Sequence, residues 1–123
     1  MKVVALNGSP RLVGNTSAAV SFILDEMEKH GFETEHIQMY GSIMTPCNDC
    51  GSCAIRGDGR CINEDDDMNA YLGRLTDADA VILASPSYFG GIPGQMGYSS
   101  NGSDLRWPHA QRATCFRARS AER

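Results

Sequence analysis

The sequence predicts an α/β fold built around a parallel sheet. Two short runs, residues 3–6 and 80–84, are wholly apolar, as in strands that are buried on both faces of a sheet. Between them, two segments repeat apolar residues at helical spacing. Strands that alternate with helices imply right-handed crossovers, and therefore parallel strands. With 123 residues, we expect one domain with a modest core.

The first half of the chain is predicted to form a strand, a helix and a second strand. The run at 3–6 ends at Asn-Gly-Ser-Pro, and a helix is predicted over 16–30, ending at Gly31. Its start offers three capping candidates, Asn15, Thr16 and Ser17. Its buried face is predicted to hold Val20, Ile23, Leu24 and Met27. Residues 34–40 alternate only partly and fit an edge strand.

The second half begins with an irregular functional loop over 41–63. A helix is predicted to begin near the three acids at 65–67, where negative charge suits a helix N-terminus. We interpret these acids as a helix start rather than a metal site. The helical spacing continues through Met68, Tyr71, Leu72 and Leu75. His30 and His36 are interpreted as a helix end and a strand face rather than as ligands.

Charge and hydropathy exclude some classes of function. Residues 1–96 carry six basic and thirteen acidic side chains, which argues against general nucleic-acid binding. No apolar run reaches membrane-spanning length, so no membrane partner is expected. The N-terminal apolar run is too short for a secretory signal, and we expect a cytoplasmic protein.

Residues 7–17, NGSPRLVGNTS, join the first strand to the first helix. Small residues, hydroxyls and a helix N-terminus together make a phosphate site. The spacing is not that of a P-loop, because Asn15 stands where lysine is required, and the dinucleotide fingerprint is absent. An ordinary capped turn is the alternative.

Four of the five cysteines fall within fifteen residues: Cys47, Cys50, Cys53 and Cys61. In a chain without a secretion signal this density favours metal or cluster binding over disulfides. The spacing of the first three is that of bacterial ferredoxins. Structural zinc is the main alternative, although zinc sites more often use two separated pairs of cysteines.

The segment Gly8-Ser9-Pro10-Arg11, followed by Gly14-Asn15-Thr16, resembles the first phosphate loop of the NADPH-dependent FMN reductase and iron–sulfur flavoprotein families. In these families the loop holds the phosphate of FMN. The resemblance implies this role for Ser9, Arg11, Asn15, Thr16 and Ser17.

Residues 85–91, SPSYFGG, are similar to the second flavin loop of the same families. The resemblance places this loop beside the isoalloxazine ring and implies binding by Pro86, Ser87, Tyr88, Phe89 and Gly90. Taken alone, Tyr88 and Phe89 would be read as core packing at a strand end. Both loops follow neighbouring strands at the switch point of the sheet, where ligands bind in such folds. The cysteine motif resembles the one that holds a [4Fe–4S] cluster, which implies that role for Cys47, Cys50, Cys53 and Cys61.

The resemblance implies a flavodoxin-like, three-layer α/β/α fold with strand order 2-1-3-4-5, of which about three strands are present. It implies an FMN-dependent oxidoreductase or electron carrier that uses NAD(P)H or a ferredoxin-like carrier, with homo-oligomers common in the family. The flavin would perform the chemistry, so no catalytic side chain is assigned. The alternatives are a small zinc-stabilised binding domain and a nonfunctional fragment of a flavoprotein gene.

The resemblance ends near residue 96. We predict that 1–96 form the N-terminal part of the FMN-binding domain and that 97–123 form a basic tail without regular structure. The abrupt change of pattern suggests a shifted reading frame or a misjoined end. The strand at 80–84 would then be an exposed edge, and we expect weak or no activity from this polypeptide.

Overall fold

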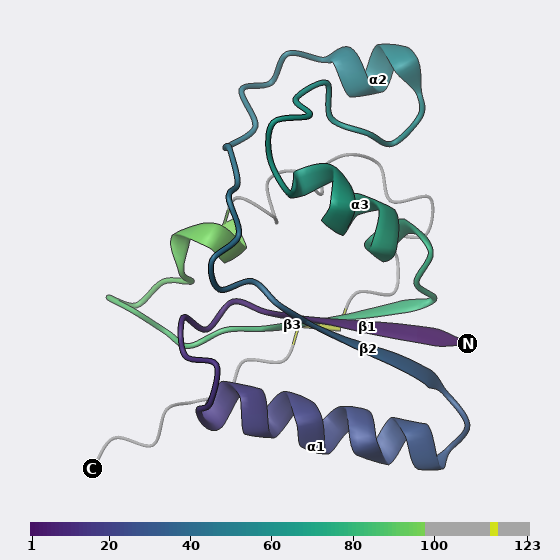
Figure 1. Ribbon diagram of the computed structural model, residues 1–123, viewed down its shortest axis with the longest axis vertical. Helices are drawn as coiled ribbons and strands as arrows, with labels where there is room; N and C mark the ends of the chain where they lie inside the picture. Colours follow the sequence, from purple (N-terminus) through teal and green to yellow (C-terminus); the bar gives the residue numbers. More distant parts are fainter. Residues whose placement is uncertain (98–113, 116–123) are drawn as a thin grey trace.

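The computed structural model describes residues 1–97 and 114–115. Four parallel strands form one sheet in the order β2-β1-β3-β4: β1 is Lys2–Asn7, β2 is Glu33–Gln38, β3 is Ala80–Ala84 and β4 is Thr114–Cys115. Helix α1, Asn15–Lys29, covers one face of the sheet, and α3, Met68–Thr76, covers the other (Figure 1). The short helix α2, Ser52–Arg56, lies beyond α3 and away from the sheet (Figure 1). The predicted α/β class and parallel sheet are confirmed.

Strand β1 is the centre of the sheet, and residues 3–7 in it are fully buried. Successive side chains in a strand point to opposite faces. Val4 and Leu6 therefore pack in the cluster beneath α3, whereas Val3 and Ala5 pack against α1. The wholly apolar sequence of this strand follows from burial on both faces.

Helix α1 begins and ends close to its predicted bounds, and Val20 and Leu24 are its most buried residues. The expected side-chain cap is wrong. The N-cap is Gly14, and no side chain bonds the first turn from the capping position. Gly31 follows the helix with a φ of +82° and donates its N–H to the carbonyl of Glu28. A positive φ favours glycine, which is why the helix ends there.

Helix α3 confirms the predicted start after the three acids, with Asp67 at the N-cap. Its buried residues are the four of the predicted apolar face: Met68, Tyr71, Leu72 and Leu75. Strand β2 is shorter than the predicted 34–40 but lies at the sheet edge as expected. The loop over 41–63 is not wholly irregular, because it contains α2.

Strand β3 contributes residues to both apolar clusters, as the uninterrupted apolar sequence predicts. Its outer edge is not fully exposed, because Ile82 and Leu83 pair with Thr114 and Cys115 of β4. The expectation of an unpaired edge is therefore wrong at these two positions. The rest of the predicted tail, residues 98–113 and 116–123, lies outside the described residues, and the domain boundary near residue 96 stays a prediction.

Candidate functional site

The two loops expected to bind flavin leave the same edge of the sheet. Asn7, the last residue of β1, is in register with Ala84, the last residue of β3. The N–H of Gly8 then donates to the carbonyl of Ala84 at 2.8 Å. Loop 8–14 and loop 85–91 therefore begin one hydrogen bond apart, on the same side of the sheet (Figure 1). In open parallel sheets, ligands bind at the carboxyl ends of the strands, where these two loops lie.

Asn7 organises the first loop from a fully buried position. Its Oδ1 accepts from the N–H of Ser9 at 3.0 Å, and its Nδ2 donates to Oγ of Ser17 at 2.9 Å. Gln38 of β2 donates from Nε2 to the carbonyl of Ser9 at 2.7 Å. Buried polar groups need such partners, so these bonds fix the backbone of the loop. Sequence reasoning missed Asn7 and Gln38, although a polar residue that closes an apolar strand was a visible signal for Asn7.

The five residues predicted to hold phosphate divide into different roles. Ser17 uses its single hydroxyl proton to bond the carbonyl of Leu12 at 3.1 Å, so it supports the loop from within. Ser9 is buried, and its Oγ accepts from the N–H of Arg11 at 3.2 Å. The guanidinium-bearing Arg11 is exposed, and so is Asn15 at the start of α1.

The N-terminus of α1 is well suited to an anion. The first N–H groups of a helix have no partner within it, and the helix dipole adds partial positive charge. No acidic residue lies in the first turn of α1 to oppose an anion. Thr16, half-buried in this turn, lines an apolar groove between α1 and β3 that also contains Ile23 and Ile82.

His36 is on a strand face, as interpreted from sequence, and it also contacts Asn7, the residue that organises the first loop. Its Nε2 lies 3.4 Å from Nδ2 of Asn7. Desolvation lowers the pKa of His36, which favours the neutral ring that accepts a hydrogen bond.

The second loop contains a tight turn at residues 88–91. The N–H of Tyr88 donates to the carbonyl of Gly91, and the N–H of Gly91 donates back to Tyr88, at 3.0 and 2.9 Å. Both central residues have positive φ, 49° at Phe89 and 77° at Gly90. Phe89 is fully exposed and Tyr88 is 43 % exposed, so core packing is excluded for both rings. An exposed aromatic ring on a strained backbone is typical of a ligand-contacting residue.

On the side where the chain enters it, the cysteine loop is anchored to the two residues that precede α3. Asp67 and Ile43 exchange two bonds: the N–H of Ile43 donates to Oδ2 of Asp67, and the N–H of Asp67 donates to the carbonyl of Ile43. Asp66 accepts from the N–H of Thr45 at 2.9 Å. Two of the three acids interpreted from sequence as a helix start, Asp66 and Asp67, therefore also hold the loop.

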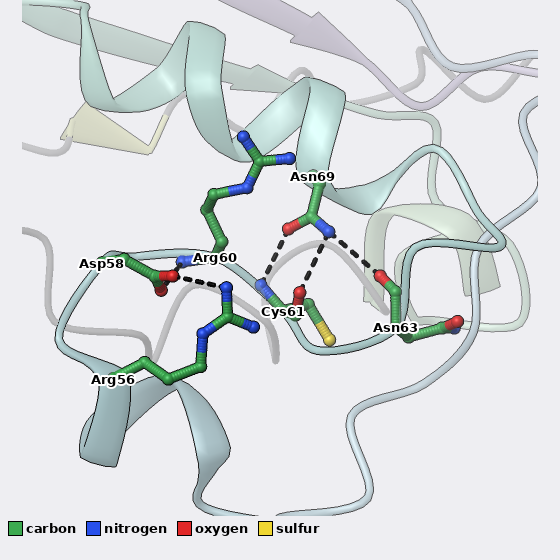
Figure 2. Close-up of polar contacts among 6 residues, drawn as sticks. All are labelled: Arg56, Asp58, Arg60, Cys61, Asn63 and Asn69. Atoms are coloured by element: carbon green, nitrogen blue, oxygen red, sulfur yellow. Dashed lines mark hydrogen bonds and ion pairs between the residues drawn. The ribbon is translucent and has the colours of Figure 1, made fainter.

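Asn69 anchors the loop where the chain leaves it. Its Oδ1 accepts from the N–H of Cys61 at 2.7 Å, and its Nδ2 donates to the carbonyls of Cys61 and Asn63, each at 3.0 Å. Figure 2 shows these three bonds on the backbone of residues 61–63, with the sulfur of Cys61 directed away from Asn69.

A compact turn precedes Cys61. Asp58 pairs with Arg56 at 2.6 Å and accepts from the N–H of Arg60 at 3.0 Å (Figure 2). The bond from the Arg60 N–H, helped by the Arg56 guanidinium, lowers the pKa of the Asp58 carboxyl. Gly57 and Gly59 on either side have positive φ, which is why the turn uses glycine there.

The four cysteines of this loop are free thiols. Cys47 and Cys50 are exposed, and Cys53 and Cys61 are half-buried. Within residues 1–97, no group of three or more His, Cys, Asp or Glu side chains lies close enough to hold a metal ion. The donor chemistry nevertheless suits a thiolate-ligated metal. The Ser52 hydroxyl, 3.4 Å from Sγ of Cys50, lowers the pKa of that thiol and so favours the ligating thiolate.

Comparison with known proteins assigns these features to a family. The sequence model of the family described as NADPH-dependent FMN reductase matches residues 1–97. The chain belongs to the NADPH-dependent FMN reductase family. This confirms the resemblance drawn from the two loops, and the match ends where the sequence pattern changes.

Two relatives of this chain are named iron–sulfur flavoproteins. One from Methanocaldococcus jannaschii is 38 % identical over 96 residues, which is 78 % of this chain and 48 % of the relative. One from Archaeoglobus fulgidus is 38 % identical over 96 residues, or 78 % of this chain and 42 % of the relative. The chain therefore spans about half the length of the curated relatives it matches.

The fold of the family is also found among solved structures. The crystal structure of RosB, with bound intermediate 8-demethyl-8-formylriboflavin-5′-phosphate, superposes with a TM-score of 0.67 at 18 % identity, covering 86 % of this chain and 43 % of RosB. This likeness confirms the flavodoxin-like architecture. No helix among the described residues of this family member is long and apolar enough to cross a membrane.

Proposed function

We propose that this chain is the FMN-binding part of an FMN-dependent oxidoreductase. In this proposal the flavin lies at the C-terminal edge of β1 and β3, and a [4Fe–4S] cluster lies in the cysteine loop. NAD(P)H or a ferredoxin-like carrier would supply the electrons, in a cytoplasmic protein that can form homo-oligomers. Family membership and the names of the relatives support the flavin and the cluster.

The observation that carries the proposal is the hydrogen bond from Gly8 to Ala84. It joins the starts of a phosphate-type loop and an exposed aromatic turn. A flavin mononucleotide needs these two features together: donors for a dianionic phosphate and surface for a flat, amphipathic ring. Neither loop alone distinguishes FMN from other phosphate esters.

At the phosphate, the chain would supply its own preorganised donors. The N-terminal N–H groups of α1 and the guanidinium of Arg11 attract the phosphate, and Asn15 and Thr16 add polar groups beside it. Ser9 and Ser17 hold the loop in place through their bonds within it. Because these bonds lie within the loop itself, they preorganise it and reduce the ordering required on binding.

At the ring, the residues of the second loop would provide contact surface and keep water away. Tyr88 and Phe89 are exposed and can contact a planar ligand, and Pro86, Ser87 and Gly90 flank them along the chain. When bound, FMN would supply hydride or electron transfer, and the protein would position it.

Cys47, Cys50, Cys53 and Cys61 would hold the [4Fe–4S] cluster, which supplies one-electron transfer when bound. Their side chains must approach one another for this, because the described thiols are not gathered. Gly51, Gly57 and Gly59 have positive φ along the loop and provide the turns that such a loop requires.

Anaerobic reconstitution with FMN, iron and sulfide, followed by gel filtration and a visible spectrum, tests the proposal. We expect retained yellow flavin together with broad iron–sulfur absorption. Riboflavin, which lacks the phosphate, is the matched ligand control and should be retained less. A colourless protein that retains only zinc would overturn the proposal in favour of a zinc-stabilised binding domain. The oxidation of NAD(P)H by the same sample tests the prediction of weak activity.

A further inference from the structure

Cys61 differs from the other three cysteines in how its backbone is held. Both its N–H and its carbonyl bond the side chain of Asn69, at 2.7 and 3.0 Å. Asn69 also donates a third bond, to the carbonyl of Asn63, and so holds the backbone two residues beyond Cys61. Asn69 lies in the first turn of α3, which packs on the sheet through Tyr71 and Leu75. The position of Cys61 is thus tied to the core of the domain.

The other three cysteines lie between the anchors of the loop. On the entry side, the last anchored residue is Thr45, held by Asp66. On the exit side, Asn69 holds Cys61. Residues 46–60 form an arm between these points, and this arm carries Cys47, Cys50 and Cys53. Asp66 also accepts from Nδ2 of Asn63 at 3.0 Å, so residues next to both ends of the arm are bonded to the chain just before α3.

We propose that Asn69 is a positioning residue for the metal centre of the cysteine loop. It holds Cys61 as a fixed thiol, and the arm closes on that thiol to bring Cys47, Cys50 and Cys53 to the same metal. This inference rests on the proposed thiolate-ligated centre. It adds the order in which the site forms: Cys61 is in place before the metal binds, and the arm then brings the other three cysteines.

The direction of the Cys61 side chain agrees with this role. In Figure 2 its backbone faces Asn69 while its sulfur points away from the helix, so the bonds that fix the residue leave the thiol available. Groups that orient metal ligands without touching the metal commonly change metal affinity by about 10- to 100-fold when they are removed. Asn69 holds a ligand by its backbone, and we expect an effect of that size.

The experiment is an anaerobic titration with Co²⁺, because cobalt bound by thiolates has visible absorption bands that report both affinity and ligand type. The variants are Asn69→Ala, Asn69→Asp and Asn48→Ala. Asn48 is an exposed asparagine beside Cys47, and it provides the same substitution away from the anchor. Asn69→Asp keeps an oxygen that can accept from Cys61 but removes both donated bonds.

We expect Asn69→Ala to weaken cobalt binding roughly 10- to 100-fold, Asn69→Asp to fall between it and the native chain, and Asn48→Ala to bind like the native chain. A second readout needs no metal: alkylation of the apo protein, with each labelled cysteine identified by mass spectrometry. Asn69→Ala should accelerate labelling of Cys61 while leaving the rate at Cys47 unchanged.

Equal cobalt affinity in Asn69→Ala and the native chain would overturn the positioning role. Faster labelling at both cysteines would also overturn it, because the substitution would then have loosened the whole loop. If the native chain forms no thiolate–cobalt bands, the proposed metal centre fails together with this inference, while retention of FMN still decides the flavin proposal separately.

Discussion

Gly8 lies against Met96. A Cβ added at Gly8 would come within 3.0 Å of both the Cβ and the Cε of Met96. Met96 is only 3 % exposed and packs in the apolar cluster of Leu6 and Val81. Gly8 is therefore held both by packing against Met96, which follows the second loop, and by its hydrogen bond to Ala84, which precedes that loop.

We predict that Gly8→Ala lowers the free energy of unfolding by about 1–3 kcal/mol, because an extra methyl group must displace a well-packed core residue. Urea denaturation of the apo protein measures this change. Gly73→Ala is the matched control, since a Cβ there meets nothing within 4 Å and the residue lies inside α3. It should raise stability by up to about 1 kcal/mol through helix propensity. Equal effects of the two substitutions would contradict the packing argument.

We predict that Ser17→Ala weakens FMN binding and also destabilises the apo protein. Its hydroxyl accepts from the buried Asn7 and donates to the carbonyl of Leu12, so its loss removes two bonds that hold the loop. A loss of about 1 kcal/mol is expected in unfolding. Ser21→Ala, an exposed serine of α1, is the matched control. If FMN affinity falls while apo stability is unchanged, Ser17 is a direct phosphate ligand instead of a support.

The elements of the fold could be predicted because burial leaves a pattern in the sequence. The buried faces of α1 and α3 follow from apolar residues at helical spacing, and the doubly buried strands β1 and β3 follow from uninterrupted apolar runs. The two strand pairs Ile82 with Thr114 and Leu83 with Cys115 could not be predicted. A two-residue strand is too short to show alternation, and its pairing depends on contacts distant in sequence.

The kinds of ligand at the candidate site could be predicted from the sequence, but the hydrogen bonds within its loops could not. Loop composition pointed to an anion at the helix start, and cysteine spacing pointed to a metal. The use of the Ser17 hydroxyl within the loop, and the bonds from Asn69 to Cys61, join residues whose partners are set by tertiary structure. No periodic pattern marks an asparagine on α3 as the partner of a cysteine eight positions earlier, because the chain between them is irregular.

We predict that acid weakens the fold in part through His36. Desolvation lowers its pKa from the ordinary 6.5, so between the two values the unfolded chain binds more protons than the folded one. The stabilising contribution of the neutral ring is complete above about pH 6.5 and is lost as the pH falls through the lowered pKa. Urea midpoints measured from about pH 7.5 to pH 5 should fall less steeply in His36→Gln than in the native chain.

Ser21→Ala, a substitution at an exposed residue of α1 that does not titrate, provides the control for this titration. Its pH profile should follow that of the native chain more closely than His36→Gln does. The role of His36 is wrong if both replacements change the profile equally. The neutral ring of His36 would also keep the 3.4 Å contact with Asn7. Acid should therefore weaken FMN binding as well as the stability of the fold.

Phe89 combines two features that stability alone does not favour. Its φ is +49°, a region that costs a non-glycine residue about 1 kcal/mol or more, and its ring is fully exposed. We predict that Phe89→Gly raises the free energy of unfolding of the apo protein by up to about 1 kcal/mol, since glycine adopts this φ without steric strain. The same variant should retain less FMN, because the contact surface for the ring is reduced.

Ser87→Gly separates strain relief from the general effect of introducing glycine. Ser87 is exposed in the same loop and is not among the residues with positive φ, so glycine there should lower stability by about 0.5–1 kcal/mol through the entropy of the unfolded chain. Opposite signs at positions 87 and 89 indicate that the turn at 88–91 stores strain. Strain of this kind persists where the surrounding structure or a ligand requires it. If Phe89→Gly gains stability and retains FMN fully, the ring does not contact the flavin, and the aromatic surface must come from Tyr88 alone.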